Sequence, residues 1–407
     1  MKSNYKRLGD YIQLVDERNK GLKVDKLLGI NINKHFMPSV ANIVGTDLSN
    51  YKIVQKNQFA CNRMHVGRDY RIPIAISDIE SPFIVSPAYD VFEIKDSKIL
   101  MPDYLMMWFS RLEFDRNAWF YTDADVRGGL AWKAFEDMQL PIPSIEKQRE
   151  IVEEYNTIQN RITLNQNLIQ KLEATAQAIY KEWFVDFEFP NEEEKPYKTN
   201  GGEMVWCEEL GKEIPKGWKV MKIGEEVSII RGASPRPIDE YMSKDNTGVP
   251  WVKISDATDC STRYLFKTNQ YISLNGVSNS RKVQTDTLIL SNSASPGLPR
   301  ILMIDACIHD GWLAFDKYKR ISKEILLEFL IYNRQEIVSL SNGSVFNNLK
   351  TDILKEFRII VPNESVVDRI TIILKKLNNQ LLTCAKYNKT LNLFLELLLS
   401  KLATIEN

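Results

Sequence analysis

The chain has 407 residues, of which 44% are hydrophobic and 26% charged, so it is long enough for two or three globular domains. Lysine and arginine together number 53, as do aspartate and glutamate, and this zero net charge excludes a protein that coats nucleic acid by charge alone. No run of about 18 apolar residues is present, which excludes a transmembrane helix. The first residues also lack the apolar core of a signal peptide, so we expect a cytosolic protein without membrane partners.

Two segments of the chain, residues 1–145 and 216–362, contain short apolar runs that are typical of β-strands. Each strand pair is followed by a helical pattern, which predicts one α+β domain in each segment. The expected elements are strands at 82–86 and 89–94 and a helix at 102–112 in the first segment, and strands at 287–291 and 300–304 and a helix at 323–337 in the second.

A heptad pattern occurs twice, 219 residues apart, in segments 146–185 and 363–407. Its apolar positions advance by alternating steps of four and three residues, which places them on one face of a helix about 39 residues or roughly 58 Å long. The residues expected to pair are Ile151, Ile158, Ile162, Asn165 and Leu172 in the first helix, and Ile370, Leu377, Leu381, Asn388 and Leu395 in the second.

An antiparallel arrangement of the two helices is favoured by the position of their asparagines. The two ends of the pattern match when facing residue numbers add up to 553, and Asn165 then faces Asn388. A buried asparagine pair rejects other registers, because a slip leaves an amide in an apolar layer. The sequence thus predicts two similar α+β domains and an antiparallel coiled coil with pseudo-twofold symmetry. The alternative is two unrelated helices, each packed on its own domain.

The segments before the two helices are also similar. Pro143 and Pro362 precede the helices at the same offset of 219, and Leu8-Gly9-Asp10 matches Ile223-Gly224-Glu225 at an offset of 215. Between the halves, residues 186–215 hold nine acidic residues and three lysines, with prolines and a Gly-Gly pair, which is typical of a linker. The chain is therefore interpreted as a duplicated scaffold with divergent loops.

Motifs for catalysis or cofactor binding are missing from the sequence. It has no Pro-Pro of an adenine methyltransferase loop, no Gly-x-Gly turn and no phosphate-binding loop. The five cysteines and three histidines are scattered without metal-ligand spacing, so neither a metal nor a cofactor is expected. Asp78 with Glu93-Ile94-Lys95 mimics a nuclease metal site, but such spacing arises often by chance, and Glu93 and Lys95 fit the solvent face of a strand better. We therefore expect a protein that is not itself an enzyme.

The junction of domain and helix resembles a known family. Leu140-Pro141-Ile142-Pro143 followed by Glu146-Lys147-Gln148-Arg149, together with Trp183-Phe184-Val185-Asp186, resembles the specificity (S) subunits of type I restriction-modification systems. The resemblance implies two target recognition domains that each read one half of a bipartite sequence in double-stranded DNA. It also implies helices that set the spacer and dock two adenine methyltransferase (M) subunits, which restriction (R) subunits can join. The second copy lacks the glutamine, which places the equivalence of the two docking surfaces in question.

The candidate DNA contacts are cationic and amide side chains in loops next to glycine or proline, since these side chains read base edges and bind phosphates. They are Asn62, Arg63, His65, Arg68, Arg71, Arg127 and Lys133 in the first half, and Arg231, Arg236, Lys253, Asn292, Arg300, Asn347 and Lys350 in the second.

Two other functions are compatible with parts of the pattern. One is a coiled-coil scaffold that joins two protein-binding domains without contacting DNA. The other, an autonomous nuclease or methyltransferase, lacks its motifs. The recognised bases and the spacer length do not follow from the sequence.

Overall fold

The computed structural model describes residues 5–39, 45–64, 66–122, 128–243, 247–339 and 348–405. The chain forms two compact units: Met1–Thr163 with Lys389–Asn407 is the first, and Leu164–Asn388 is the second. Each long helix contributes one segment to each unit. Within the described ranges, no helix is both long and apolar enough to cross a lipid bilayer.

The first unit is built on a four-stranded antiparallel sheet with the order β2-β9-β6-β7. Phe59 stacks on Phe92 at 5.0 Å between ring centroids, and Phe135 lies 5.6 Å from Phe92, so aromatic rings fill the space between this sheet and the helices. The strands are β1 (Tyr5–Arg7), β2 (Ile12–Val15), β3 (Leu28–Ile30), β4 (Phe36–Pro38), β5 (Lys52–Val54), β6 (Phe59–Cys61), β7 (Ile74–Ile76), β8 (Phe83–Val85), β9 (Asp90–Ile94) and β10 (Gln139–Pro141). The helices are η1 (Leu8–Asp10), η2 (Leu48–Asn50), α1 (Val66–Asp69), α2 (Pro102–Phe109), α3 (Leu112–Phe120) and α4 (Trp132–Asp137).

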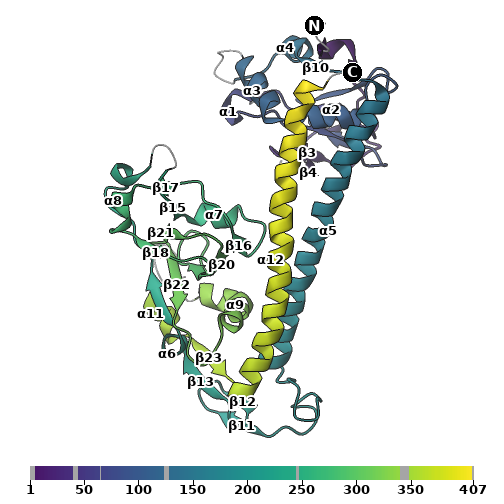
Figure 1. The fold of residues 1–407 in the computed structure, drawn as a ribbon. Helices are drawn as coiled ribbons and strands as arrows, with labels where there is room; N and C mark the ends of the chain where they lie inside the picture. The colour runs from purple at the N-terminus through teal and green to yellow at the C-terminus, as the bar shows by residue number, and fades with distance from the viewer. Residues whose placement is uncertain are drawn as a thin grey trace. The chain divides into compact units, whose positions relative to one another are not determined.

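The second unit contains a five-stranded sheet, β14-β22-β19-β20-β16, and a four-stranded sheet, β17-β15-β21-β18. Figure 1 shows these strands in green between α6 and α11 at one end and α7 and α8 at the other. The strands are β11 (Met204–Cys207), β12 (Lys212–Pro215), β13 (Lys219–Lys222), β14 (Ser228–Arg231), β15 (Val249–Val252), β16 (Tyr264–Leu265), β17 (Tyr271–Ile272), β18 (Arg281–Val283), β19 (Leu288–Ser291), β20 (Pro299–Leu302), β21 (Ala306–Ile308), β22 (Trp312–Asp316) and β23 (Arg358–Val361). The helices are α6 (Ile223–Glu226), η3 (Ile238–Tyr241), α7 (Ile254–Thr258), α8 (Leu274–Val277), α9 (Lys323–Tyr332), α10 (Arg334–Ser339) and α11 (Thr351–Glu356).

The four predicted strands are confirmed as β8, β9, β19 and β20. Both short helices end earlier than the sequence predicted. The first ends at Phe109, because Arg111 has an extended backbone that separates α2 from α3. The second ends at Tyr332, where the Asn333 side chain donates a hydrogen bond to the carbonyl oxygen of Phe329 at 2.9 Å. An asparagine amide that competes for helical carbonyls in this way favours a break.

The duplication extends to the register of the strands. Tyr5 of β1 faces Pro141 of β10, and Val220 of β13 faces Ile360 of β23, which are the same positions at offsets of 215 and 219. Two central sheets also share one order, since β2-β9-β6-β7 corresponds to β14-β22-β19-β20, to which the second unit adds β16 at the edge. Each unit by itself therefore contains the same scaffold.

Gly9 and Gly224 show why the duplicated Leu/Ile-Gly-acid motif requires glycine. A Cβ atom on Gly9 would lie 2.8 Å from Cβ of Glu136, and one on Gly224 would lie 2.9 Å from Cβ of Lys355. Both distances are shorter than real carbon contacts. The helical turn at each glycine thus packs directly against α4 in the first unit and α11 in the second.

The two heptad segments form the long helices α5 (Ile145–Phe184) and α12 (Glu364–Lys401), and η4 (Leu402–Thr404) continues the second by one tighter turn. All ten residues expected to pair are buried or half-buried, while most of the residues between them are exposed. In the second unit, Nδ2 of Asn165 donates to Oδ1 of Asn388 at 2.8 Å, as the register predicts.

Contacts inside each unit establish the antiparallel direction. In the first unit, Ile151 near the start of α5 shares an apolar cluster with Leu402 after α12. In the second, Ala176 near the end of α5 shares a cluster with Leu374 near the start of α12 (Figure 1). The predicted antiparallel coiled coil between α+β domains is therefore confirmed.

Gln148 explains the motif at the start of the first helix. Its amide donates to the carbonyl oxygens of Ile99 at 2.8 Å and Pro143 at 2.9 Å, and accepts from the backbone N–H of Met101 at 2.8 Å. The side chain is fully buried. At the equivalent position of the second copy stands Val367, which cannot make these bonds.

Candidate nucleic-acid interface

Most of the sequence-predicted DNA contacts that the structure describes lie near one end of the central sheet in their unit. In the second unit, β14 ends at Arg231 and β19 ends beside Asn292, while β20 begins beside Arg300. Adjacent strands run antiparallel in the order β14-β22-β19-β20, so β14 and β19 finish and β20 begins at the same end of the sheet. We call this end the loop end of the sheet. In the first unit the loop end lies where β6 finishes and β7 and β9 begin, and it carries the loop from Asn62 to Arg71.

Asp310 organises the loop end of the second unit. Its carbonyl oxygen accepts hydrogen bonds from Nε of Arg231 and Nδ2 of Asn292, both at 3.1 Å. Its carboxylate accepts from Oγ of Ser234 at 2.7 Å and lies 3.6 Å from Nη2 of Arg236. Three predicted contacts on two segments, Arg231 and Arg236 on one and Asn292 on the other, are thus brought together by one residue that the prediction did not include.

The charge of Asp310 is maintained by its neighbours. Burial raises the pKa of this carboxyl, but the hydrogen bond from Ser234 and the nearby His309 and Arg236 outweigh burial and hold the pKa below its usual range. The Arg236 side chain remains 74% exposed, so its guanidinium is available to a ligand. Burial also lowers the pKa of His309, whose Nδ1 accepts the backbone N–H of Gly311 at 2.6 Å.

Arg63 and Asn292 occupy equivalent positions in the two units. The carbonyl oxygen of Arg63 accepts from the N–H of Leu130 at 3.0 Å, and that of Asn292 accepts from Leu349 at 2.8 Å. Arg63 also pairs with Asp90, with 2.6 Å between Nε and Oδ2, and its side chain is only 19% exposed. Asn292 is 4% exposed. In both units the backbone bond connects the end of a central strand to the loop that precedes the short helix before the coiled coil.

The remaining candidates of the first unit are more accessible. Arg68 of α1 is 68% exposed beside Asp69, and Lys133 of α4 is 72% exposed at 3.2 Å from Asp137. Arg71 is half-buried, and Oδ1 of Asn62 accepts the N–H of Met64 at 3.0 Å. In the second unit Lys253 places its ammonium group 5.3 Å from the centre of the Trp251 ring, and Lys350 is exposed before α11. His65, Arg127 and Asn347 lie outside the described residues.

Arg263, absent from the predicted set, lies near the loop end of the second unit, at the start of β16. Its guanidinium pairs with the fully buried Glu328 at 2.6 Å and with Glu173 of α5 at 3.1 Å. Sequence reasoning passed over it because no glycine or proline marks its position. The dipeptide Asp310-Gly311 did carry a signal, since such a pair between two apolar runs is typical of a tight turn between strands.

The nuclease-like spacing has a structural explanation. Glu93 accepts hydrogen bonds from Gln13 at 2.8 Å and Gln58 at 3.0 Å, while Nζ of Lys95 donates to the carbonyl oxygen of Gly9 at 2.9 Å. The residues thus join neighbouring strands and η1. Within the ranges that the structure describes, no three histidine, cysteine, aspartate or glutamate side chains are grouped as metal ligands.

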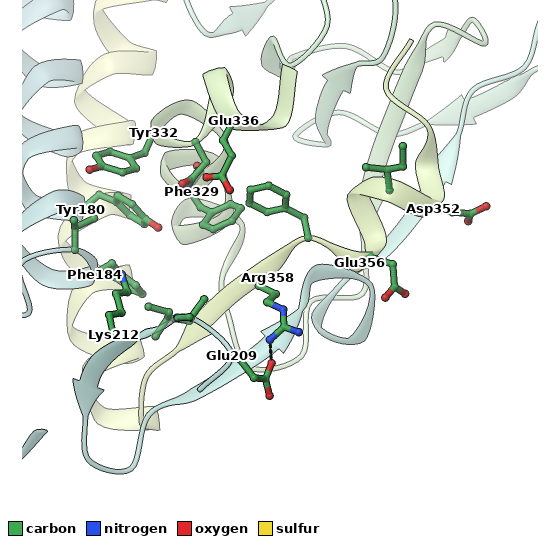
Figure 2. A pocket seen from close by; sticks show the side chains of 16 residues that line it. Tyr180, Phe184, Glu209, Lys212, Phe329, Tyr332, Glu336, Asp352, Glu356 and Arg358 are labelled. Atoms are coloured by element: carbon green, nitrogen blue, oxygen red, sulfur yellow. Dashed lines mark hydrogen bonds and ion pairs between the residues drawn. The ribbon is translucent and has the colours of Figure 1, made fainter. Parts of the chain in front are cut away.

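A cavity of about 880 Å³ lies elsewhere in the second unit. Figure 2 shows Tyr180 and Phe184 of α5 and Phe329 and Tyr332 of α9 among the residues that line it, together with the ion pair of Glu209 and Arg358. It contains no residue of the predicted DNA-binding set.

Comparison with known proteins supports the family predicted from the sequence. Residues 215–392 match the model of the type I restriction modification DNA specificity domain. The MjaIX type I specificity subunit of Methanocaldococcus jannaschii is 30% identical over 135 residues, a match that spans 32% of this chain and 29% of the relative. The HindI type I specificity subunit of Haemophilus influenzae is 21% identical, with 91% of both chains covered.

A solved structure shares the fold over nearly the whole chain. The S subunit of a type I restriction-modification system from M. genitalium aligns with 99% of this chain and 96% of its own, with a TM-score of 0.56 and 13% identity. The fold therefore defines a class of proteins with two α+β domains and a coiled coil. Within it, the chain is similar to the specificity subunits of type I restriction-modification systems, as the sequence predicted.

Proposed function

We propose that this chain recognises DNA sequence as the specificity subunit of a type I restriction-modification complex. One observation carries the proposal: two equivalent sheets place exposed cations near the same end, Arg68 near one and Arg236 near the other. Each such end reads one half of a bipartite target in double-stranded DNA. The recognition domains are residues 1–145 and 216–362, joined by linker 186–215. The helical segments 146–185 and 363–407 set the spacer between the half-sites.

The accessible and the braced residues have different roles in this proposal. Exposed cations such as Arg68, Lys133 and Arg236 bind phosphates or reach base edges. Arg63 and Asn292, which are held by internal bonds, shape the loops that meet the bases. A backbone contact positions the protein on DNA, whereas a base contact specifies the sequence, so the two groups should differ in how their loss affects specificity. We retain His65, Arg127 and Asn347 as sequence-based candidates.

The outer faces of the helices support a second part of the proposal, the docking of two methyltransferase (M) subunits. Leu164 and Leu168 of α5 are 57% and 44% exposed in the second unit, and Leu393 and Phe394 of α12 are both 52% exposed in the first. These residues lie outside the paired seam, so nothing in the coiled coil requires them to be apolar. The M subunits, joined by restriction (R) subunits, supply the chemistry, including rotation of the target adenine out of the duplex. Because its substrate is DNA, we place the complex in the cytosol.

Methylation mapping tests the proposed function. The chain is co-expressed with its genomic M partner in a host without adenine methylation, and methylated adenines are located genome-wide. The expected result is one bipartite motif with an unread spacer, which disappears when the chain is omitted. A motif that persists without the chain would refute the proposal. A purified complex that binds no DNA in a gel shift would favour a protein-binding scaffold instead.

A further inference from the structure

A second cavity in the second unit lies beside the loop end of the five-stranded sheet. It has a volume of about 360 Å³ and opens between α5, the loop before β16, the start of β20 and the start of α10. Three arginines line it: Arg263, Arg300 and Arg334. All of its walls belong to the same compact unit.

The charges around this cavity do not balance. Glu173 and Glu328 both pair with Arg263, at 3.1 and 2.6 Å. These two carboxylates therefore neutralise Arg263. Among the residues that the structure describes, neither Arg300 nor Arg334 forms an ion pair. Two guanidinium groups therefore line one small cavity without a carboxylate partner.

Arg300 is held in position but is left incompletely bonded. Its Nη1 and Nη2 atoms donate to the carbonyl oxygens of Pro299 and Ala257, both at 3.0 Å, which fixes the plane of the guanidinium. Its Nε atom is buried and has no hydrogen-bond partner. Burial lowers the pKa of this guanidinium; Cys260 and Glu173 oppose this shift, and the charges of Arg334 and Arg263 add to it. An anion in the cavity would offset the repulsion between the guanidinium groups.

We propose that this cavity binds a phosphate group through Arg300 and Arg334, and that the phosphate belongs to the DNA backbone. This inference rests on the proposed function. Guanidinium groups match the geometry of phosphate oxygens, and a single tetrahedral group fits the cavity volume. Arg300 follows the first residue of β20, so the site borders the loop end that carries Arg231, Arg236 and Asn292. The backbone contact next to the second recognition surface would fix how the duplex lies against this domain.

The salt dependence of DNA binding tests the proposal. The complex of the full chain with M subunits is titrated with its duplex target at several salt concentrations, with Arg334→Ala, Arg334→Lys and the control Lys319→Ala. Lys319 is exposed just beyond the opposite end of the sheet, so its variant removes one positive charge away from the cavity. The slope of log affinity against log salt should become shallower by about 0.9 in Arg334→Ala, the value for one lost phosphate contact. Arg334→Lys should restore most of the slope, and Lys319→Ala should keep it.

A second arm distinguishes DNA phosphate from free phosphate. The thermal midpoint of the same complexes is measured with and without inorganic phosphate at constant ionic strength. If the slopes of wild type and Arg334→Ala agree while phosphate stabilises only the wild type, the DNA source is refuted. If neither the slope nor the midpoint responds, the whole site is refuted. Wild-type complex that binds no DNA at all would instead refute the proposed function, which keeps the two failures distinct.

Discussion

Tyr5 of β1 and Val220 of β13 hold equivalent positions, yet the two halves complete this corner of the fold differently. Tyr5 packs against Trp108 at 6.0 Å and donates its hydroxyl to the carbonyl oxygen of Ala403 at 2.9 Å. Val220 offers neither a ring nor a hydroxyl. The positions equivalent to Trp108 and Ala403 are Phe329 and Phe184, and they line the cavity shown in Figure 2. The comparison teaches that strand register survives in a duplicated scaffold while side-chain packing diverges.

A second difference concerns charge in the core. Position 107 in α2 is methionine, whereas the equivalent position 328 in α9 is glutamate, fully buried against Arg263. Arg263 precedes β16, the strand that only the second sheet has. The added strand thus introduces a buried cation, and Glu328 neutralises it.

Replacing Glu328 with methionine, the residue of the first half, should have the largest effect on stability. Loss of one partner from a buried ion pair costs about 3–5 kcal/mol, since the other charge stays buried. Chemical unfolding of the second unit should show this loss. The double variant Arg263→Met/Glu328→Met should recover most of it. A single variant as stable as wild type would mean that Glu173 alone satisfies Arg263.

Alanine at Gly9 or Gly224 should destabilise both halves to a similar extent. The new Cβ would lie 2.8 or 2.9 Å from the Cβ of a neighbouring helix residue. Forcing extra atoms into packed structure costs about 1–3 kcal/mol. Gly29→Ala is the control, because its Cβ would meet only the Tyr89 hydroxyl at 3.6 Å. If only one of the two variants is destabilised, the scaffolds differ more than their backbones indicate.

The sequence predicted the features that are duplicated along the chain and the helices whose apolar residues recur with a fixed period. Alternating steps of four and three located a buried stripe along α5 and α12, and the asparagines set the register. The matching glycines marked equivalent positions in the two halves, and the structure shows that both pack closely against a helix. The loop ends could not be derived in this way, because Asp310 and Arg263 act through segments far apart in the chain. Their partners depend on the strand order and on buried charge, neither of which leaves a periodic signal.

Asn165→Leu should lower stability by about 2 kcal/mol, because Asn388 is left buried without its 2.8 Å partner. Thermal unfolding should report the loss. The double variant Asn165→Leu/Asn388→Leu should be as stable as wild type or more so, since two apolar residues replace the pair. A double variant that loses as much as the single would show that the amides have other essential partners.

Acid should lower the stability of the second half at a higher pH than that of the first half. The expected loss is smaller than the losses predicted for the variants above. Burial lowers the pKa of His309 below its ordinary value of 6.5, so the unfolded chain binds this proton more readily. The stability present above that pH should therefore decline as the pH falls below 6.5, towards the lowered pKa. Hydrogen exchange at pH 5 and pH 7 should show faster opening of β21 and β22 at low pH. His309→Asn should reduce this difference, and an unchanged pH response would exclude His309 as its source.

The separation of recognition between the two halves is tested most directly by methylation mapping of two variants. Arg68→Ala in the first half and Arg236→Ala in the second are each expressed with the M subunits, and tolerated mismatches are scored across the target. Each variant should relax or weaken methylation through one half-site only, and the affected half-sites should differ. If both variants alter the same half-site, or if each alters both equally, the two halves do not read DNA independently and the account is contradicted.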